Sequence, residues 1–174
     1  MILILIGYMG SGKSTIGRAL AKKLGYDFLD LDDYIELKEN KTIPEIFKSK
    51  GEIYFRKAET FYLTELLSSK QNLVLSLGGG TPCYGNNMGV VLNAKHAQSV
   101  YLKASIPTLV GRLKQEKQTR PLIAHLKTDE QLTEFIGKHL FERSPFYAQA
   151  HKTIITDGKA QTELVNEIKQ EILI

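Results

Sequence analysis

The sequence is poor in cysteine, and this shortage excludes one class of protein. Cys83 is the only cysteine among 174 residues, so no disulfide can form within the chain. The chain is therefore not a small secreted domain stabilised by disulfides. A lone thiol suits a reducing compartment, and we expect a cytoplasmic protein.

Long apolar runs and charge tracts are also missing. The apolar run at residues 2–6 is far shorter than the about 20 residues of a membrane helix, and it lacks the positively charged lead of a signal peptide. The net charge is only +4, with no basic tract, and phosphorylated small molecules explain this mild basicity as well as nucleic acid does. We expect neither a membrane nor a nucleic acid as a partner.

What is present is an ordinary globular composition, with 43% hydrophobic and 24% charged residues. The chain is long enough to bury one normal core and too short for two full-sized domains. It contains no internal repeat, low-complexity stretch or linker. We therefore expect a single domain over residues 1–174, and we expect it to be a monomer.

The most informative segment follows the first apolar run. Residues 7–14 read G-Y-M-G-S-G-K-S, the phosphate-loop pattern G-x-x-x-x-G-K-[ST]. Its glycines let successive backbone N–H groups point at a polyphosphate, and the helix N-terminus that follows adds partial positive charge. Lys13 is expected to reach the β- and γ-phosphates, and the Ser14 hydroxyl to bind Mg²⁺. The pattern predicts a nucleoside triphosphate site.

Apolar segments alternate with amphipathic ones along the rest of the chain. Strands are expected at residues 2–6, 28–31, 73–77, 99–102 and 153–155. Helices are expected at residues 14–24, 42–49, 52–67, 105–113, 130–150 and 161–173. The stretch 114–128 is polar and is expected to be irregular. This order predicts an α/β fold in which helices cover both faces of a five-stranded parallel sheet.

Carboxylates follow the second expected strand. Ligands of open α/β sheets bind beyond the carboxyl ends of the strands, and residues two apart on a strand share a face. Asp30 and Asp32 are therefore expected to enter the site together, one near Mg²⁺ and the other on a substrate hydroxyl. The alternative is helix capping, with Asp32 or Asp33 at the N-terminus of a helix that starts near Tyr34.

Three glycines, Gly78, Gly79 and Gly80, end the third expected strand. They would let a ligand approach the backbone closely, and a plain flexible turn is the alternative. No acid follows this strand. Asp30 is therefore the acidic group expected nearest to the metal.

Four arginines have two interpretations each. An arginine fork binds a carboxylate or a phosphate, but Arg56 has Glu59 three residues on, and by itself this spacing favours an intrahelical ion pair. Arg120 lies in the polar stretch, where a lid arginine would neutralise charge during phosphoryl transfer. Arg120 and Arg143, taken singly, are more often solvated surface charges, and Arg112 is similarly ambiguous.

Taken in order, these segments resemble the shikimate kinase family. The matching motifs, which run from the first strand to about residue 150, are G-Y-M-G-S-G-K-S-T, F-L-D-L-D, G-E-I-Y-F-R-K-A-E, L-G-G-G, T-R-P-L and E-R-S-P-F-Y. The phosphate loop is shared by many families, whereas the ordered combination is much more specific and reverses the preference on Arg56. The resemblance implies a nucleoside-monophosphate-kinase-like fold with a substrate-binding region at about 32–60 and a lid at about 114–128.

The implied reaction is transfer of the γ-phosphate of ATP to the 3-hydroxyl of shikimate, with Mg²⁺ as cofactor, on the chorismate route to aromatic amino acids. The implied catalytic residues are Lys13, Asp32 and Arg120. ATP would be bound by Gly10, Ser11, Gly12, Lys13, Ser14, Thr15, Arg112 and Arg120. Shikimate would be bound by Asp32, Arg56, Gly78, Gly79, Gly80 and Arg143. The metal would be held by Ser14 and Asp30. Residues 81–87 lie outside the matching motifs. The family's last adenine contact has no clear match, and Lys159 or a neighbour is the residue offered for it.

Other functions remain as alternatives. A related small-molecule kinase, such as a gluconate kinase, would share the phosphate loop and the fold but would not need the Arg56 and Arg143 pair. A nucleoside monophosphate kinase fits the substrate-side residues less well. A non-catalytic nucleotide-binding module would keep the fold without turnover, and the presence of Lys13, Asp32 and Arg120 argues against it.

Overall fold

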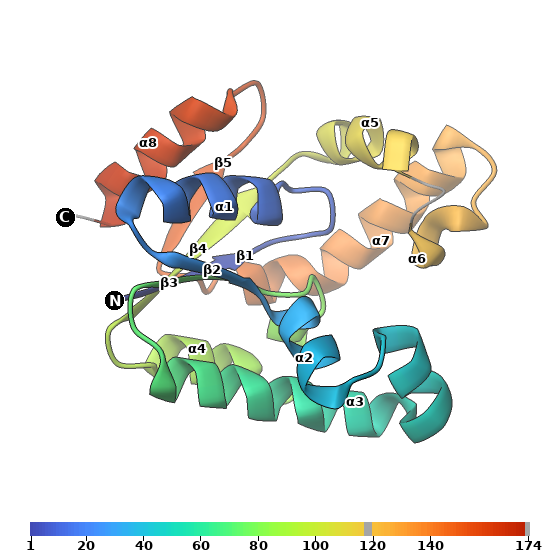
Figure 1. Cartoon of the computed structure of the whole chain (residues 1–174). Helices are drawn as coiled ribbons and strands as arrows, with labels where there is room; N and C mark the ends of the chain where they lie inside the picture. The colour runs from blue at the N-terminus through green and yellow to red at the C-terminus, as the bar shows by residue number, and fades with distance from the viewer. Residues whose placement is uncertain (117–119, 173–174) are drawn as a thin grey trace.

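Five parallel strands form the central layer of the molecule (Figure 1). The computed structural model describes residues 1–116 and 120–172. The strands are β1 (Ile2–Ile6), β2 (Asp27–Asp30), β3 (Leu73–Ser76), β4 (Ala97–Lys103) and β5 (Lys152–Ile155). Their spatial order is β2-β3-β1-β4-β5, and every neighbouring pair is parallel. The predicted five-stranded parallel sheet is confirmed.

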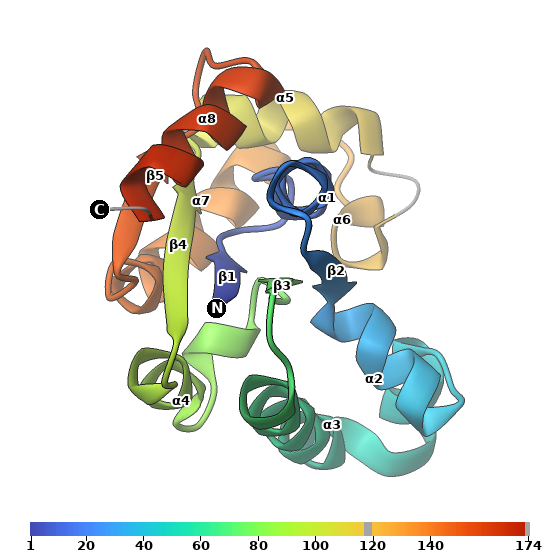
Figure 2. The same ribbon diagram turned by 60° about the vertical axis from the view of Figure 1, so that its left-hand side comes forward.

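Helices cover both faces of the sheet, as predicted (Figures 1 and 2). One face carries α1 (Lys13–Leu24) and α8 (Gln161–Ile172), and the other carries α3 (Ile43–Ser69), α4 (Asn87–Asn93) and α7 (Asp129–Tyr147). The remaining elements are α2 (Leu31–Glu39), the 3₁₀ turn η1 (Thr81–Cys83), α5 (Ile106–Glu116) and α6 (Pro121–Ala124). Figure 2 shows α2 and α3 continuing from the β2 edge of the sheet, apart from α1 and α8.

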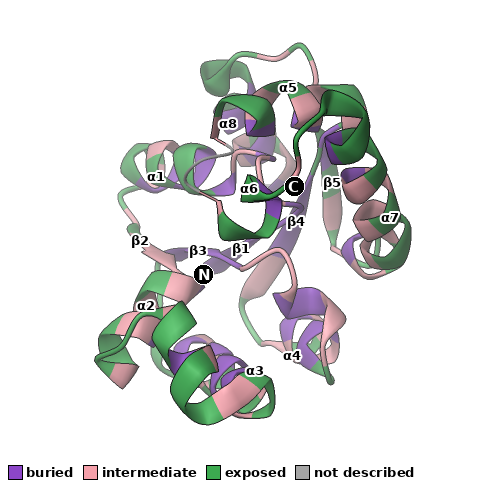
Figure 3. Ribbon diagram, turned by 90° about the vertical axis from the view of Figure 1, so that its right-hand side faces the viewer, coloured by how far each residue is buried: buried purple, intermediate pink, exposed green. Residues whose placement is uncertain are grey.

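The first strand explains why the chain builds two cores. Successive residues of a strand point to opposite faces, so Leu3 and Leu5 pack toward α1 and α8 while Ile2, Ile4 and Ile6 pack toward the other helices. All five are almost completely buried. Figure 3 shows the sheet as the buried centre, with the outer sides of the helices exposed. An unbroken aliphatic run is what a strand covered on both faces requires.

The helix predicted at 42–49 and the one predicted at 52–67 are joined in the structure. They form α3, which is interrupted at Gly51, where φ is 83°. The helix begins with a capping box: Thr42 N donates to Glu45 Oε2 at 2.7 Å, and Glu45 N donates to Thr42 Oγ1 at 3.4 Å. This region therefore begins as the sequence predicts and bends where a glycine permits a left-handed backbone.

Two short helices were not predicted. The first, α4, has only seven residues, too few for a helical period to stand out. The second, α6, lies in the stretch 114–128 that was expected to be irregular, and it starts at Pro121, a residue suited to a first helical turn. Residues 117–119 of the expected lid and residue 173 of the closing helix lie outside the described residues. Within the described ranges, no helix has the length and apolar character needed to cross a bilayer.

Candidate nucleotide and acceptor site

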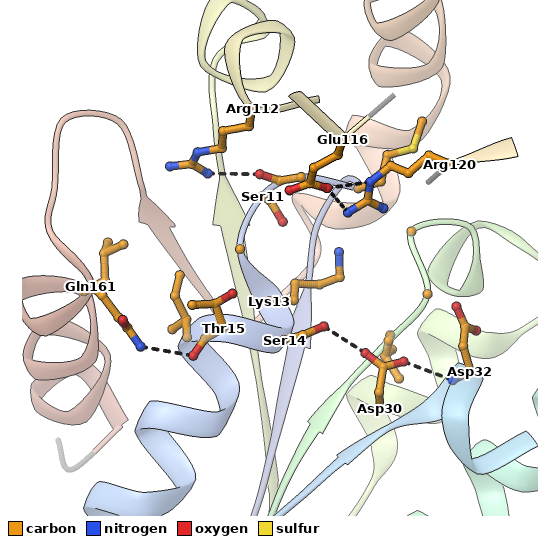
Figure 4. Close-up of a pocket in the computed structure, with 18 of the residues that line it drawn as sticks. Ser11, Lys13, Ser14, Thr15, Asp30, Asp32, Arg112, Glu116, Arg120 and Gln161 are labelled. Carbon is orange, nitrogen blue, oxygen red and sulfur yellow. Dashed lines mark hydrogen bonds and ion pairs between the residues drawn. The ribbon is translucent and has the colours of Figure 1, made fainter. Parts of the chain in front are cut away.

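A cavity of about 430 Å³ lies at the carboxyl ends of the central strands (Figure 4). It is lined by every predicted ATP-binding residue, by both predicted metal ligands, and by Asp32 with two of the three glycines. The residues of these groups are Gly10, Ser11, Gly12, Lys13, Ser14, Thr15, Asp30, Asp32, Gly78, Gly79, Arg112 and Arg120. The structure therefore gathers into one cavity residues that are more than one hundred positions apart in the chain.

The phosphate loop presents Lys13 to this cavity. Gly12 adopts the left-handed conformation, with φ 96°, and α1 starts directly after it. The Lys13 side chain is buried, and its ammonium donates to Gly7 O at 2.8 Å and to Tyr8 O at 3.0 Å. Burial lowers the pKa of Lys13 to about 8, although Asp30 and Asp32 oppose the shift. A buried ammonium whose hydrogen bonds go to neutral carbonyls is suited to receive an anionic phosphate.

Asp30 is a helix cap as well as a cavity residue. Its Oδ1 accepts from the backbone N–H of Asp32 at 3.1 Å, and its Oδ2 accepts from Ser14 Oγ at 3.1 Å. The prediction that Asp30 and Asp32 share a strand face is wrong, because β2 ends at Asp30 and the chain turns into α2 at Leu31. The alternative cap, Asp32 or Asp33, is wrong as well. The turn nevertheless leaves both Asp30 and Asp32 in the cavity.

The Ser14 and Asp30 oxygens form the pair that fits a magnesium ion. Mg²⁺ prefers oxygen ligands, and beside a substrate phosphate it usually takes only one or two from the protein. The described residues include no cluster of three His, Cys, Asp or Glu side chains that would hold a metal. The pair lies beside Lys13 in the cavity, as Figure 4 shows, so an ion bound there would be next to the phosphates.

Asp32 is the carboxylate nearest to the glycine run. Burial, together with the nearby carboxylates Asp30 and Glu59, raises its pKa to about 7, and Lys13 opposes the shift. A Cβ built on Gly78 would lie only 3.0 Å from Asp32 Oδ1. The close approach leaves little room for a side chain at Gly78 and places a group that titrates near neutral pH beside the backbone.

The predicted acceptor-binding side chains meet at the glycine run. A Cβ on each glycine would lie within 4 Å of one of them: 3.0 Å from Asp32 Oδ1 at Gly78, 3.7 Å from Arg143 Nη1 at Gly79 and 3.6 Å from Arg56 Nη1 at Gly80. These residues come from α2, α7 and α3. One carboxylate and two guanidinium groups therefore surround the glycine run, which is not a free turn.

Arg56 forms the expected ion pair and also lies at the site. Its Nη1 is 3.2 Å from Glu59 Oε2, and its Nε is 3.5 Å from Glu52 Oε1. Glu59 is 1% exposed, and its Oε1 accepts from Thr81 Oγ1 at 2.6 Å. The two interpretations of Arg56 are thus compatible, because the ion pair with Glu59 holds the guanidinium beside Gly80. The spacing identified Glu59 only as an ion-pair partner, and its link to Thr81 has no signal in the sequence.

Tyr147 is a second residue that the sequence interpretation missed. It lies one helical turn after Arg143 on α7, is fully buried, and its hydroxyl donates to Gly79 O. Residues four apart share a helix face, so α7 contacts the glycine run twice. The signal was present in the motif E-R-S-P-F-Y, which places this tyrosine four positions after the arginine.

The nucleotide end of the cavity contains the other two predicted arginines. Arg112 Nη1 donates to Gly10 O at 3.0 Å. Arg120 lines the cavity and pairs with Glu116, with Nε to Oε2 at 2.7 Å. Lys159 and Gln161 close this end from the other side, and Gln161 Nε2 donates to Thr15 O at 3.2 Å. Glu116 and Gln161 were not predicted, whereas Lys159, offered as an adenine contact, lines the same cavity.

The arrangement has two ends with different chemistry. The cavity itself offers Lys13 and Arg120 to a polyphosphate. Arg56 and Arg143 do not line it, but they lie next to it, beside Gly80 and Gly79, where they offer two guanidinium groups to a second anion. Asp32 lies between them. Such an arrangement brings a phosphate donor and an anionic acceptor together across one carboxylate.

Comparison with known proteins agrees over nearly the whole chain. The family model described as Shikimate kinase matches residues 9–173. A shikimate kinase of Flavobacterium psychrophilum is 48% identical over 166 residues, which cover 95% of this chain and 95% of that protein.

Solved structures give the same result. The crystal structure of shikimate kinase from Bacteroides thetaiotaomicron has a TM-score of 0.90 and 36% identity, and the match covers 100% of this chain and 99% of that one. Shikimate kinase from Acinetobacter baumannii in complex with shikimate has a TM-score of 0.84 and 39% identity, over 99% of this chain and 92% of that one.

Proposed function

The chain belongs to the shikimate kinase family, and we propose that it transfers the γ-phosphoryl group of ATP to the 3-hydroxyl of shikimate, giving shikimate 3-phosphate and ADP. It is an ATP-dependent phosphotransferase with an alcohol acceptor, and the reaction serves aromatic amino acid biosynthesis through chorismate. The family match does not favour a gluconate kinase or a non-catalytic module.

The glycine run Gly78–Gly80 is the observation that carries this proposal. Shikimate has one carboxylate, which suits two guanidinium forks, and a set of hydroxyls, which suits a carboxylate acceptor. Asp32, Arg143 and Arg56 flank the run, since a Cβ added at Gly78, Gly79 and Gly80 would approach one of them each.

The site residues have separate roles in phosphoryl transfer, namely acceptor binding, proton transfer and charge neutralisation. Arg56 and Arg143 bind the acceptor carboxylate, which turns the ring hydroxyls toward Asp32. Asp32 accepts the proton of the attacking hydroxyl, and its pKa of about 7 suits this role near neutral pH. Lys13 and Arg120 neutralise charge on the transferred group. Ser14 and Asp30 would hold Mg²⁺, which when bound adds further neutralisation of the phosphates.

Three finer assignments belong to the same proposal. The region at about 32–60 binds the acceptor, and the segment at about 114–128, which carries Arg120, closes over ATP and keeps water from receiving the phosphate. The protein works with Mg²⁺. It is a cytoplasmic monomer, which size-exclusion chromatography with light scattering would check.

A coupled assay of ADP release tests the function directly. Purified protein with Mg-ATP is expected to release ADP when shikimate is added and to remain at background with gluconate or with nucleoside monophosphates, because the chain belongs to the shikimate kinase family. A lack of stimulation by shikimate would overturn the assignment.

Arg143→Met is expected to raise the KM for shikimate about 30- to 100-fold and to change the KM for ATP much less. The substitution removes one of two charge-assisted contacts to the carboxylate, each typically worth about 1.5–3 kcal/mol. Lys138→Met on the same helix is the matched control, because Lys138 is 72% exposed and pairs only at the surface with Glu134. Equal KM values for shikimate in the two variants would remove Arg143 from the acceptor site.

A further inference from the structure

An aromatic ring covers Arg56 on the side formed by residues 81–87. The Tyr84 ring centroid lies 3.6 Å from Arg56 Cζ, which is a stacking distance for a guanidinium over an aromatic face. The same ring contacts the glycine run, since Tyr84 Cε2 would lie 3.2 Å from a Cβ on Gly80. Tyr84, Arg56 and Gly80 therefore form one group at the end of the glycine run, beside the residues that line the cavity and not among them.

Buried hydrogen bonds fix the segment that carries this ring. Thr81, in η1, donates through Oγ1 to Glu59 Oε1 at 2.6 Å. Asn87 Nδ2 donates to Thr81 O at 2.9 Å, and Asn87 Oδ1 accepts from Thr60 Oγ1 at 2.7 Å. Thr81 and Asn87 are both fully buried. The segment is thus attached to α3 at the turn directly after Arg56, which fixes the ring relative to that helix.

The guanidinium of Arg56 needs such a support. Its Nη1 pairs with Glu59, but its Nε is buried and has no hydrogen-bond partner among the described residues. Glu52, 3.5 Å from Nε, is 58% exposed and is a weak restraint. A ring stacked on the flat face restricts the guanidinium and leaves its in-plane N–H donors available to a carboxylate.

We propose that Tyr84 is a positioning residue for shikimate, whose ring stacks on Arg56 and orients the guanidinium edge toward the substrate carboxylate. The identity of that carboxylate rests on the proposed function. Tyr84 acts through Arg56 and contacts neither ATP nor the phosphate loop. Residues 81–87, which lie outside the family motifs in the sequence, thereby gain a role in acceptor affinity.

Substitutions at Tyr84 separate the ring from the rest of the side chain. Tyr84→Leu is expected to raise the KM for shikimate about three- to tenfold, with kcat and the KM for ATP within about twofold of wild type. Tyr84→Phe keeps the ring and is expected to stay within about twofold in all three constants. Tyr84 and Arg56 both line a surface groove beside Ile53 and Phe61, which are 76% and 64% exposed. Truncation therefore opens no cavity in the core.

A double-mutant cycle gives the decisive readout. In an Arg56→Ala background, Tyr84→Leu is expected to change the KM for shikimate no further, because the residue through which Tyr84 acts is gone. Tyr84→Met, which also lacks a ring, provides a second variant should Tyr84→Leu fold poorly, and circular-dichroism melts monitor folding in both.

Several results would overturn the inference. They are an unchanged KM for shikimate in both ringless variants, an equal loss in Tyr84→Phe, and an undiminished effect of Tyr84→Leu in the Arg56→Ala background. If the proposed shikimate kinase function were wrong, the result would differ from all of these, because the wild-type protein would show no shikimate-dependent ADP release. An active wild type whose KM for shikimate rises on Arg56→Ala, but not on loss of the Tyr84 ring, would reject the role of Tyr84 alone.

Discussion

Asp32→Asn is expected to lower the turnover of shikimate by about 10²- to 10⁴-fold, the usual contribution of a general base, while ATP binding changes little. The amide keeps the shape of the side chain but cannot take a proton, and Asp32 lies beside Gly78 at the acceptor end. The coupled ADP assay measures turnover, and titration of a fluorescent ATP analogue measures binding.

Asp33→Asn is the matched control for this variant. Asp33 is the next residue of α2, is exposed, and does not line the cavity. Its substitution is expected to leave turnover within about twofold of wild type. If Asp32→Asn instead weakened ATP binding as much as Lys13→Met, Asp32 would belong to the nucleotide end.

Asp32→Asn is also expected to stabilise the protein without bound ligands at alkaline pH. Asp32 has a pKa of about 7 in the folded state and an ordinary value of 3.8. Its contribution to the free energy of unfolding is therefore complete below pH 3.8 and is lost as pH rises toward 7. Above pH 7 the native state holds a buried, repelled carboxylate, and replacing it with an amide raises the free energy of unfolding by roughly 2–4 kcal/mol. Thermal melts at pH 8 and pH 5 are expected to show a larger gain at pH 8, and a gain independent of pH would contradict the assignment.

Lys13→Met is expected to weaken ATP binding by about 10- to 100-fold, as the loss of a charged hydrogen-bond donor predicts, and to lower turnover by at least about 10³-fold. Methionine fills the space of the buried stem but supplies no charge. Nucleotide titration and the ADP assay measure the two effects. Lys22→Met, on the exposed side of α1, is the control. Unchanged ATP affinity in Lys13→Met would contradict a role of Lys13 at the phosphates.

The parts of this site that the sequence predicts are those encoded over a few neighbouring residues. The phosphate loop is one such unit, since its glycines, Lys13 and Ser14 lie within eight positions. The buried strands are another, because an aliphatic run such as β1 can be read without its partners. The parallel sheet follows from the alternation of strands and helices, and the structure confirms it.

The remaining parts depend on contacts between distant segments or on where an element ends. Asp30 and Asp32 were predicted to enter the site for the wrong reason. The strand β2 ends one residue earlier than predicted, so the two residues do not share a strand face, and Asp30 caps α2 instead. Glu59, Thr81 and Tyr84 have roles set by a hydrogen bond and a stacking contact across more than twenty positions. No periodicity encodes such contacts.

Competition between acceptors tests the central claim most directly. Wild-type protein is incubated with Mg-ATP and equal concentrations of shikimate, gluconate and AMP, and the products are resolved by ³¹P NMR. We predict a single new phosphomonoester signal, that of shikimate 3-phosphate, together with ADP formed in equal amount. Phosphorylated gluconate, ADP formed in excess of shikimate 3-phosphate, or an unphosphorylated shikimate pool would contradict the account.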